Sequence, residues 1–143
     1  VANSWINLAA RLHLDLRIGC PSGFEPHQGL LERARKMGKS EIRIIHDPVE
    51  AVRGADVIYT DVWASMGQEE EAAERKRIFA PYQVNADLLA HAAGDCLVEH
   101  CLPAHRGDEI TDEVIDGAHS VVFDEAENRL HIQKAIMVKL MGN

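Results

Sequence analysis

Residues 96–107 read Cys-Leu-Val-Glu-His-Cys-Leu-Pro-Ala-His-Arg-Gly, and this stretch says most about the fold. Its apolar start, 96–98, predicts a buried strand, which Pro103 ends. A thiol, two imidazoles and a guanidinium lie around that proline. Ligands of open α/β sheets bind outside the carboxyl ends of the strands. We therefore expect this polar cluster to lie where such a sheet binds its substrate.

Strand and helix patterns alternate on both sides of this stretch. The apolar patterns predict strands at 16–20, 41–45, 56–60, 96–101 and 120–123, and helices at 3–14, 27–37, 47–54, 69–78, 85–92, 111–116 and about 127–141. This alternation, without a hairpin signal, predicts an α/β fold: a doubly wound, Rossmann-like parallel sheet of about five strands with helices on both faces. No Gly-x-Gly-x-x-Gly motif follows a strand, which argues against a dinucleotide site.

Composition limits the classes of protein that the chain can represent. Its 143 residues suit one domain, 1–143, and no apolar run approaches the ~20 residues of a membrane span. The net charge of −8 argues against a nucleic-acid partner. Three cysteines without a Cys-x-x-Cys pair fit a reducing compartment, which makes a cytoplasmic location the expectation and leaves a mitochondrial matrix open.

A second segment, 61–67, reads Asp-Val-Trp-Ala-Ser-Met-Gly and follows the strand expected at 56–60. A carboxylate at a strand end, followed by a hydroxyl and a glycine, suits an amino-acid ligand. Asp61 can accept hydrogen bonds from an ammonium, and Ser65 with the N–H groups near Met66 can hold a carboxylate. The alternative is an ordinary turn in which Asp61 or Ser65 caps the next helix. The residues alone leave both interpretations open.

Cys101 and Arg129 are the other candidates, and each has a plainer interpretation. Free cysteines are most often small buried residues, which is how we interpret Cys20 and Cys96. Arg129 follows an expected helix start and would suit an anion, but it could equally pair with Glu125. The histidines match no metal-ligand spacing, so no metal is expected.

Together, the segments around Asp61, Cys101 and Arg129 resemble the ornithine-binding second domain of ornithine carbamoyltransferases, along the whole chain. Aspartate carbamoyltransferases carry a proline in place of Cys101, so this residue favours the ornithine branch. The resemblance implies an ornithine site of Asp61, Ser65, Met66 and Cys101, and carbamoyl phosphate contacts from Cys101, Leu102 and Arg129.

The activity implied by the resemblance transfers a carbamoyl group from carbamoyl phosphate to the δ-amine of L-ornithine, giving L-citrulline and phosphate in arginine biosynthesis. Cys101 is the implied catalytic residue: as a thiolate it could orient the δ-amine or assist proton loss. A cis Leu102–Pro103 bond would aim the nearby carbonyls into the site. No cofactor is implied.

The family's Ser-x-Arg-Thr-Arg phosphate loop and His-Pro-x-Gln segment do not occur in this chain. We therefore expect an N-terminal carbamoyl-phosphate domain to be missing, the chain alone to be inactive, and the apolar helix near 132–141 to lack a partner surface. The full-length family is homo-oligomeric, as trimers or multiples of them. Two alternatives stay open: a stand-alone amino-acid-binding or interaction module, and a carbamoyltransferase for another amine, such as putrescine or N-acetylornithine.

Overall fold

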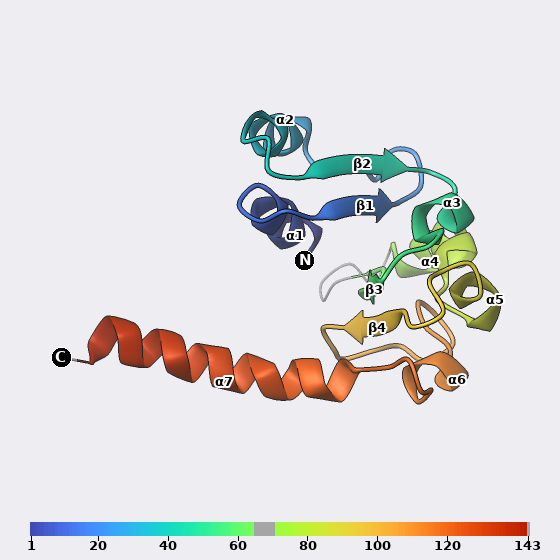
Figure 1. Ribbon diagram of the computed structural model, residues 1–143. Helices are drawn as coiled ribbons and strands as arrows, with labels where there is room; N and C mark the ends of the chain where they lie inside the picture. The colour runs from blue at the N-terminus through green and yellow to red at the C-terminus, as the bar shows by residue number, and fades with distance from the viewer. Residues whose placement is uncertain (65–70, 143) are drawn as a thin grey trace.

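The computed structural model describes residues 1–64 and 71–142, which form an α/β domain with parallel strands (Figure 1). Strands β1 (Asp15–Gly19) and β2 (Glu41–Ile45) form one parallel pair, and β3 (Val57–Thr60) and β4 (Leu97–His100) form a second. The expected parallel α/β architecture is confirmed. The sheet is smaller than expected, because the described residues form four strands in two separate pairs and not one sheet of about five.

Helices connect and cover the strands, with these bounds: α1 (Ala2–Ala9), α2 (Gln28–Lys36), α3 (Pro48–Val52), α4 (Ala72–Phe79), the 3₁₀ helix η1 (Ala80–Tyr82), α5 (Ala86–Leu89), α6 (Asp112–Ile115) and α7 (Val122–Met141). The sequence explains several of their ends. Asp47 Oδ1 accepts hydrogen bonds from the N–H groups of Val49 and Glu50, at 2.8 and 3.1 Å, and Pro48 opens α3. Gly38 follows α2 with a φ of +64°, as a C-terminal glycine should.

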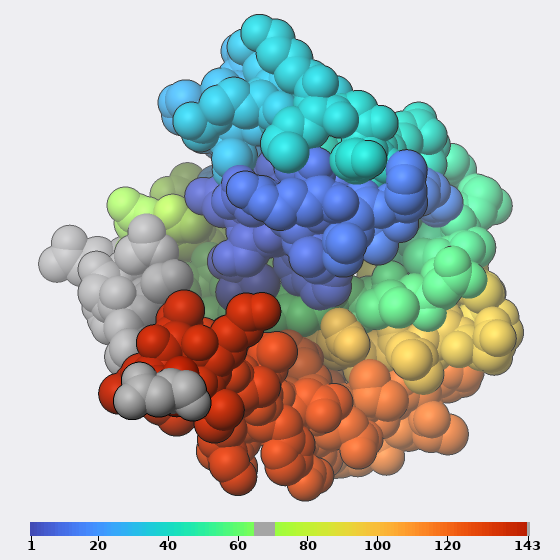
Figure 2. All heavy atoms as spheres, turned by 60° about the vertical axis from the view of Figure 1, so that its left-hand side comes forward, coloured from blue at the N-terminus to red at the C-terminus, as the bar shows by residue number. Residues whose placement is uncertain are grey.

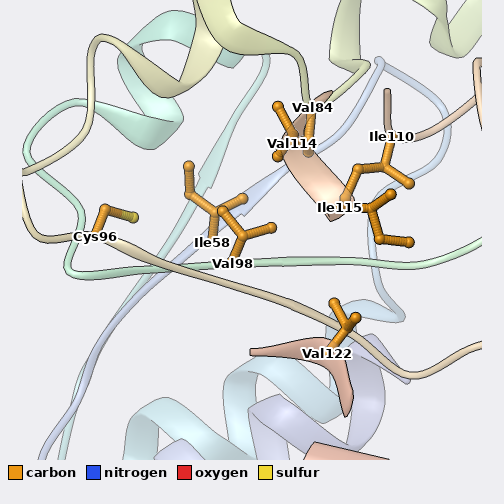
Figure 3. Close-up of a cluster of buried hydrophobic side chains, with 8 residues drawn as sticks. All are labelled: Ile58, Val84, Cys96, Val98, Ile110, Val114, Ile115 and Val122. Atoms are coloured by element: carbon orange, nitrogen blue, oxygen red, sulfur yellow. The ribbon is translucent and has the colours of Figure 1, made fainter. Parts of the chain in front are cut away.

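Each strand pair has its own hydrophobic core. The core beneath β1 and β2 consists of Ile6, Ala9, Ala10, Leu31, Ala34 and Ile42. The core beneath β3 and β4 consists of Ile58, Val84, Cys96, Val98, Ile110, Val114, Ile115 and Val122, which come from the two strands, the helices α6 and α7 and the connecting segments (Figure 3). This second core fixes the strands whose carboxyl ends carry the candidate site.

The strand expected at 120–123 is wrong. Ser120 makes only an isolated parallel bridge with Val98, and the Val121 N–H donates to the Val98 carbonyl at 2.9 Å. The chain then turns directly into α7 at Val122, not near Glu127, so that Val122 is fully buried as a helical residue. An apolar run of three residues cannot distinguish a buried strand from the buried start of a helix.

Helix α7 leaves the rest of the domain and ends far from it (Figure 1). Its later turns, red in Figure 2, stand at the surface. The apolar side chains of these turns are exposed, among them Ile132, Ile136, Val138 and Leu140. A helix with this much exposed apolar surface has room for a partner along its length.

Candidate functional site

The candidate site lies where β3 and β4 end. The two strands are parallel and in register, with Thr60 opposite His100, so the residues that follow them, Asp61 and Cys101, are also neighbours. The Cys101 thiol donates a hydrogen bond to Asp61 Oδ1 at 3.0 Å. The same oxygen accepts from the Val62 N–H at 2.8 Å. The structure thus brings together two of the predicted site residues that are forty positions apart in the sequence.

This geometry favours the neutral thiol of Cys101. Burial raises the pKa of the Cys101 thiol to about 11, and the hydrogen bond to the Asp61 carboxylate adds to the increase. Both effects disfavour a second negative charge beside Asp61. A resting thiolate, considered from the sequence, is therefore disfavoured at neutral pH. Cys101 can instead act as a half-buried hydrogen-bonding group.

The loop after Cys101 has an unusual backbone. The Leu102–Pro103 peptide bond is cis, the isomer that the sequence left open, and Leu102 has a φ of +50°. Residues other than glycine rarely adopt this left-handed conformation, so the surrounding structure must hold Leu102 in it. The Leu102 N–H donates to Nδ1 of His100 at 2.8 Å. This hydrogen bond fixes the loop that carries two of the predicted carbamoyl phosphate contacts, Cys101 and Leu102.

A buried pair beneath this loop was missed by sequence reasoning. His100 and Glu109 are both fully buried, and His100 Nε2 lies 3.1 Å from Glu109 Oε1. Because Nδ1 accepts from Leu102, the ring is neutral and its proton is on Nε2, which donates to Glu109. The His105 N–H also donates to Glu109, which closes the loop on itself.

The carboxylate of Glu109 is held in its charged form. Burial would raise the pKa of Glu109, but the hydrogen bonds from His100 and from backbone N–H groups, including that of His105, outweigh burial and lower it. His100 and the His105 N–H both donate to Oε1, while Oε2 is buried without a partner among the described residues, so one oxygen joins the strand end to the loop. No motif spacing marks this pair, since only the fold places Glu109 beneath His100.

Arg129 lies apart from this cluster. It is an exposed residue of α7, and within residues 1–64 and 71–142 it makes no hydrogen bond or ion pair, including with Glu125. The expectation that Arg129 lies in an early turn is wrong. Because α7 begins at Val122, the free N–H groups of its first turn lie about two turns before Arg129. The N-cap position is Val121, and Asp124 lies in the first turn.

Ser65 and Met66, the other predicted ornithine contacts, lie outside the described residues. Trp63, just before them, is half-buried: its ring stacks on Phe79 of α4, with centroids 6.1 Å apart, and Phe79 meets Phe24 edge-on at 4.9 Å. Aromatic packing therefore anchors the chain on the approach to the predicted ornithine segment.

The described part of the chain contains no group of three His, Cys, Asp or Glu side chains placed to hold a metal ion. Cys20 and Cys96 are buried and free of disulfides, and burial raises the pKa of both thiols, as suits cysteines of the core. Within the same residues, no helix has the length and apolarity needed to span a membrane.

Comparison with known proteins gives consistent relatives. Residues 1–140 match the family model described as "Aspartate/ornithine carbamoyltransferase, Asp/Orn binding domain". The ornithine carbamoyltransferase of Chlorobaculum tepidum is 57% identical over 143 residues, which cover 100% of this chain and 42% of that protein. The enzyme of Syntrophotalea carbinolica is 59% identical over 142 residues, which cover 99% and 47%. The chain thus spans about half the length of the curated relatives that it matches.

Solved structures agree. Ornithine carbamoyltransferase from Pyrococcus furiosus superposes with a TM-score of 0.89 at 52% identity, covering 96% of this chain and 45% of that one. An N-acetyl-L-ornithine transcarbamylase superposes with a TM-score of 0.85 at 32% identity, covering 99% and 44%.

Proposed function

Because the chain belongs to the aspartate/ornithine carbamoyltransferase family, through its Asp/Orn binding domain, we propose that it is the ornithine-binding half of an ornithine carbamoyltransferase. The observation that carries this proposal is the hydrogen bond between Cys101 and Asp61 at the carboxyl ends of β3 and β4. It places an anion and a neutral sulfur side by side, where parallel sheets bind ligands.

The proposed roles follow from the charges. The Asp61 carboxylate suits the α-ammonium of ornithine, with Ser65 and Met66 contributing to the same site. The attacking δ-amine must be neutral, because an ammonium has no lone pair. A neutral thiol at Cys101 can orient that amine without stabilising its protonated form, which a thiolate would do.

Carbamoyl phosphate would meet Cys101 and Leu102 on one side and Arg129 on the other. The rigid loop above the His100–Glu109 pair suits this role, since orientation lowers the barrier only if the orienting groups stay in place. The other phosphate-binding groups would come from a carbamoyl-phosphate half like that of the relatives. The assembled enzyme would work as a homo-oligomer in the cytoplasm and form L-citrulline for arginine biosynthesis.

The test is complementation. The chain is linked to the carbamoyl-phosphate half of the Chlorobaculum tepidum relative, and citrulline is measured with L-ornithine, N-acetyl-L-ornithine and putrescine. We expect turnover with ornithine and none from this chain alone. Turnover that prefers N-acetyl-L-ornithine or putrescine would instead support a carbamoyltransferase for another amine. A folded, linked protein without turnover on any amine would support a binding module.

The same linked protein tests Arg129. Arg129→Ala should raise the KM for carbamoyl phosphate about tenfold, because one charge-assisted hydrogen bond is lost, and should leave the KM for ornithine nearly unchanged. Lys134→Ala removes a positive charge from a later turn of α7 and serves as the matched control. Equal effects of the two variants would remove Arg129 from the proposed site.

A further inference from the structure

Tyr59 lies at a junction that the proposed roles do not use. It is the third residue of β3, and its ring meets the Trp5 ring of α1 edge-on, with centroids 5.2 Å apart. Its hydroxyl donates to Glu125 Oε1 of α7 at 3.1 Å. In the strand register Tyr59 lies opposite Glu99 of β4, two residues before Cys101. One side chain therefore contacts both α1 and α7 from a strand that pairs with the one ending at Cys101.

The contact with Glu125 matters because α7 has few other attachments. In the described residues, Tyr59–Glu125 is the one side-chain hydrogen bond between α7 and the rest of the domain. The other attachments are the buried Val122 and the main-chain bond from Val121 to Val98 at the start of the helix. The direction in which α7 leaves the domain thus depends on its first turn.

The surroundings of Glu125 make this bond costly to lose. Oε2 of Glu125 is buried without a partner among the described residues. Glu99 lies opposite Tyr59 in the strand register, and burial, together with the charge of Glu125, raises the pKa of Glu99. A carboxylate in this acidic, half-buried place needs the donor that Tyr59 supplies.

We propose that Tyr59 is a positioning residue: its hydroxyl ties the first turn of α7 to β3, beside the strand that ends at Cys101. Arg129 lies one helical turn after Glu125 on the same helix. The tie would hold the carbamoyl phosphate side and the ornithine side of the site in one geometry. The assignment of those two sides rests on the proposed function, whereas the tie itself can be tested without substrates.

The test compares Tyr59→Phe with Tyr82→Phe in this chain. Tyr82 is the matched control, because its hydroxyl donates to the His46 carbonyl, near the end of β2, and not to α7. Hydrogen exchange of residues 123–129 should accelerate about tenfold in Tyr59→Phe and stay at the wild-type rate in Tyr82→Phe. Glu125→Gln keeps an acceptor for Tyr59 and should preserve most of the protection that Glu125→Ala loses. Equal exchange in all these variants would overturn the proposal.

A second readout separates positioning from simple loosening. The Cys101 thiol is held by its hydrogen bond to Asp61, which does not involve Tyr59. Alkylation of Cys101 at fixed pH, mapped by peptide mass, should therefore stay close to the wild-type rate in Tyr59→Phe. Loosening without a specific contact would speed it, and that result would contradict the proposal.

The linked enzyme then shows the functional consequence. Tyr59→Phe should raise the KM for carbamoyl phosphate about tenfold, and Tyr82→Phe should not change it. Inactivity of the linked wild-type protein would count against the proposed function alone, since exchange and alkylation still decide the role of Tyr59. An active enzyme whose Tyr59→Phe variant keeps wild-type kinetics would refute the positioning role.

Discussion

Two strand ends of this domain carry a cysteine, a histidine and a glutamate, and they differ in burial and bonding. At the ends of β1 and β2, Cys20 is buried, while His46 and Glu25 lie at the surface, 3.6 Å apart. At the end of β4, the arrangement is inverted: His100 and Glu109 are fully buried, 3.1 Å apart, and the cysteine, Cys101, is half-exposed.

The difference shows what makes a strand end suitable for chemistry. The Cys20 thiol lies in the core. The hydrogen bonds of Cys20 involve its main chain: its N–H donates to the Ile45 carbonyl, and its carbonyl oxygen bonds to the His46 ring. The Cys101 thiol donates to Asp61, above a loop that the buried His100–Glu109 pair supports. The same residue types therefore give a structural end in one case and a supported, accessible thiol in the other.

The largest expected difference is in stability. Glu109→Ala leaves the buried Nε2–H of His100 and the part-buried main-chain N–H of His105 without an acceptor and should destabilise the domain by roughly 2–4 kcal/mol. Glu25→Ala, the matched change at the exposed end, should have a far smaller effect, because water replaces the lost contacts. Urea unfolding of both variants measures this. Equal losses would mean that the buried pair is no support.

The buried glutamate also predicts a pH dependence. Its pKa is lowered in the folded state from an ordinary value of 4.5. A group with a lowered pKa contributes stability that is fully present above its unfolded pKa and is lost as the pH falls through the folded pKa. The stability gap between wild type and Glu109→Ala should therefore be widest above about pH 5 and narrow below about pH 4. A gap that widens on acidification would contradict this assignment.

The next largest effect concerns activity. In the linked enzyme, Cys101→Ala should lower kcat/KM for ornithine on the order of 10²-fold, because the attacking amine loses an orienting partner. Cys20→Ala deletes the same atom at the other strand end and should lower stability while the activity of the folded protein stays close to wild type. Similar activity losses in both variants would erase the functional distinction between the two ends.

The smallest effect concerns thiol reactivity. With a pKa of about 11, only about one Cys101 thiol in 10³ is ionised at pH 8, so alkylation should be slow. Asp61→Asn removes the adjacent charge and should speed alkylation of Cys101 about tenfold. Asp95→Asn makes the same charge change next to Cys96, before the start of β4, and should leave Cys101 unaffected. A matching increase in the control would indicate a general charge effect.

Local signals in the sequence predicted much of the fold. The strand at 41–45 and the start of α3 at Asp47-Pro48 match the structure, because alternation and capping act within a few residues. The prediction of a strand at 120–123 failed because the tertiary contacts that bury Val122 would bury it equally in a strand or in a helix. The start of α7 could not be predicted from a capping motif, because the residue at its N-cap position, Val121, has no side chain that can cap the helix.

The candidate site divides in the same way. Asp61 and Cys101 could be found, because each directly follows an apolar strand pattern and parallel strands end at a common edge. Glu109 and Tyr59 could not be found, because their partners are set by the fold: Glu109 is one of several acidic residues near a turn, and Tyr59 looks like an ordinary strand aromatic. The positive φ of Leu102 could not be predicted either, because leucine normally avoids that conformation.

One measurement tests the central claim, that ornithine binds at the β3–β4 end, most directly. L-Ornithine is titrated into the linked protein, with this chain's residues isotope-labelled, and the amide spectra are followed. We expect saturable shifts concentrated at Val62, Cys101 and Leu102, which are absent in Asp61→Ala. Shifts centred on Cys20 and His46 instead, or unchanged binding in Asp61→Ala, would contradict the account.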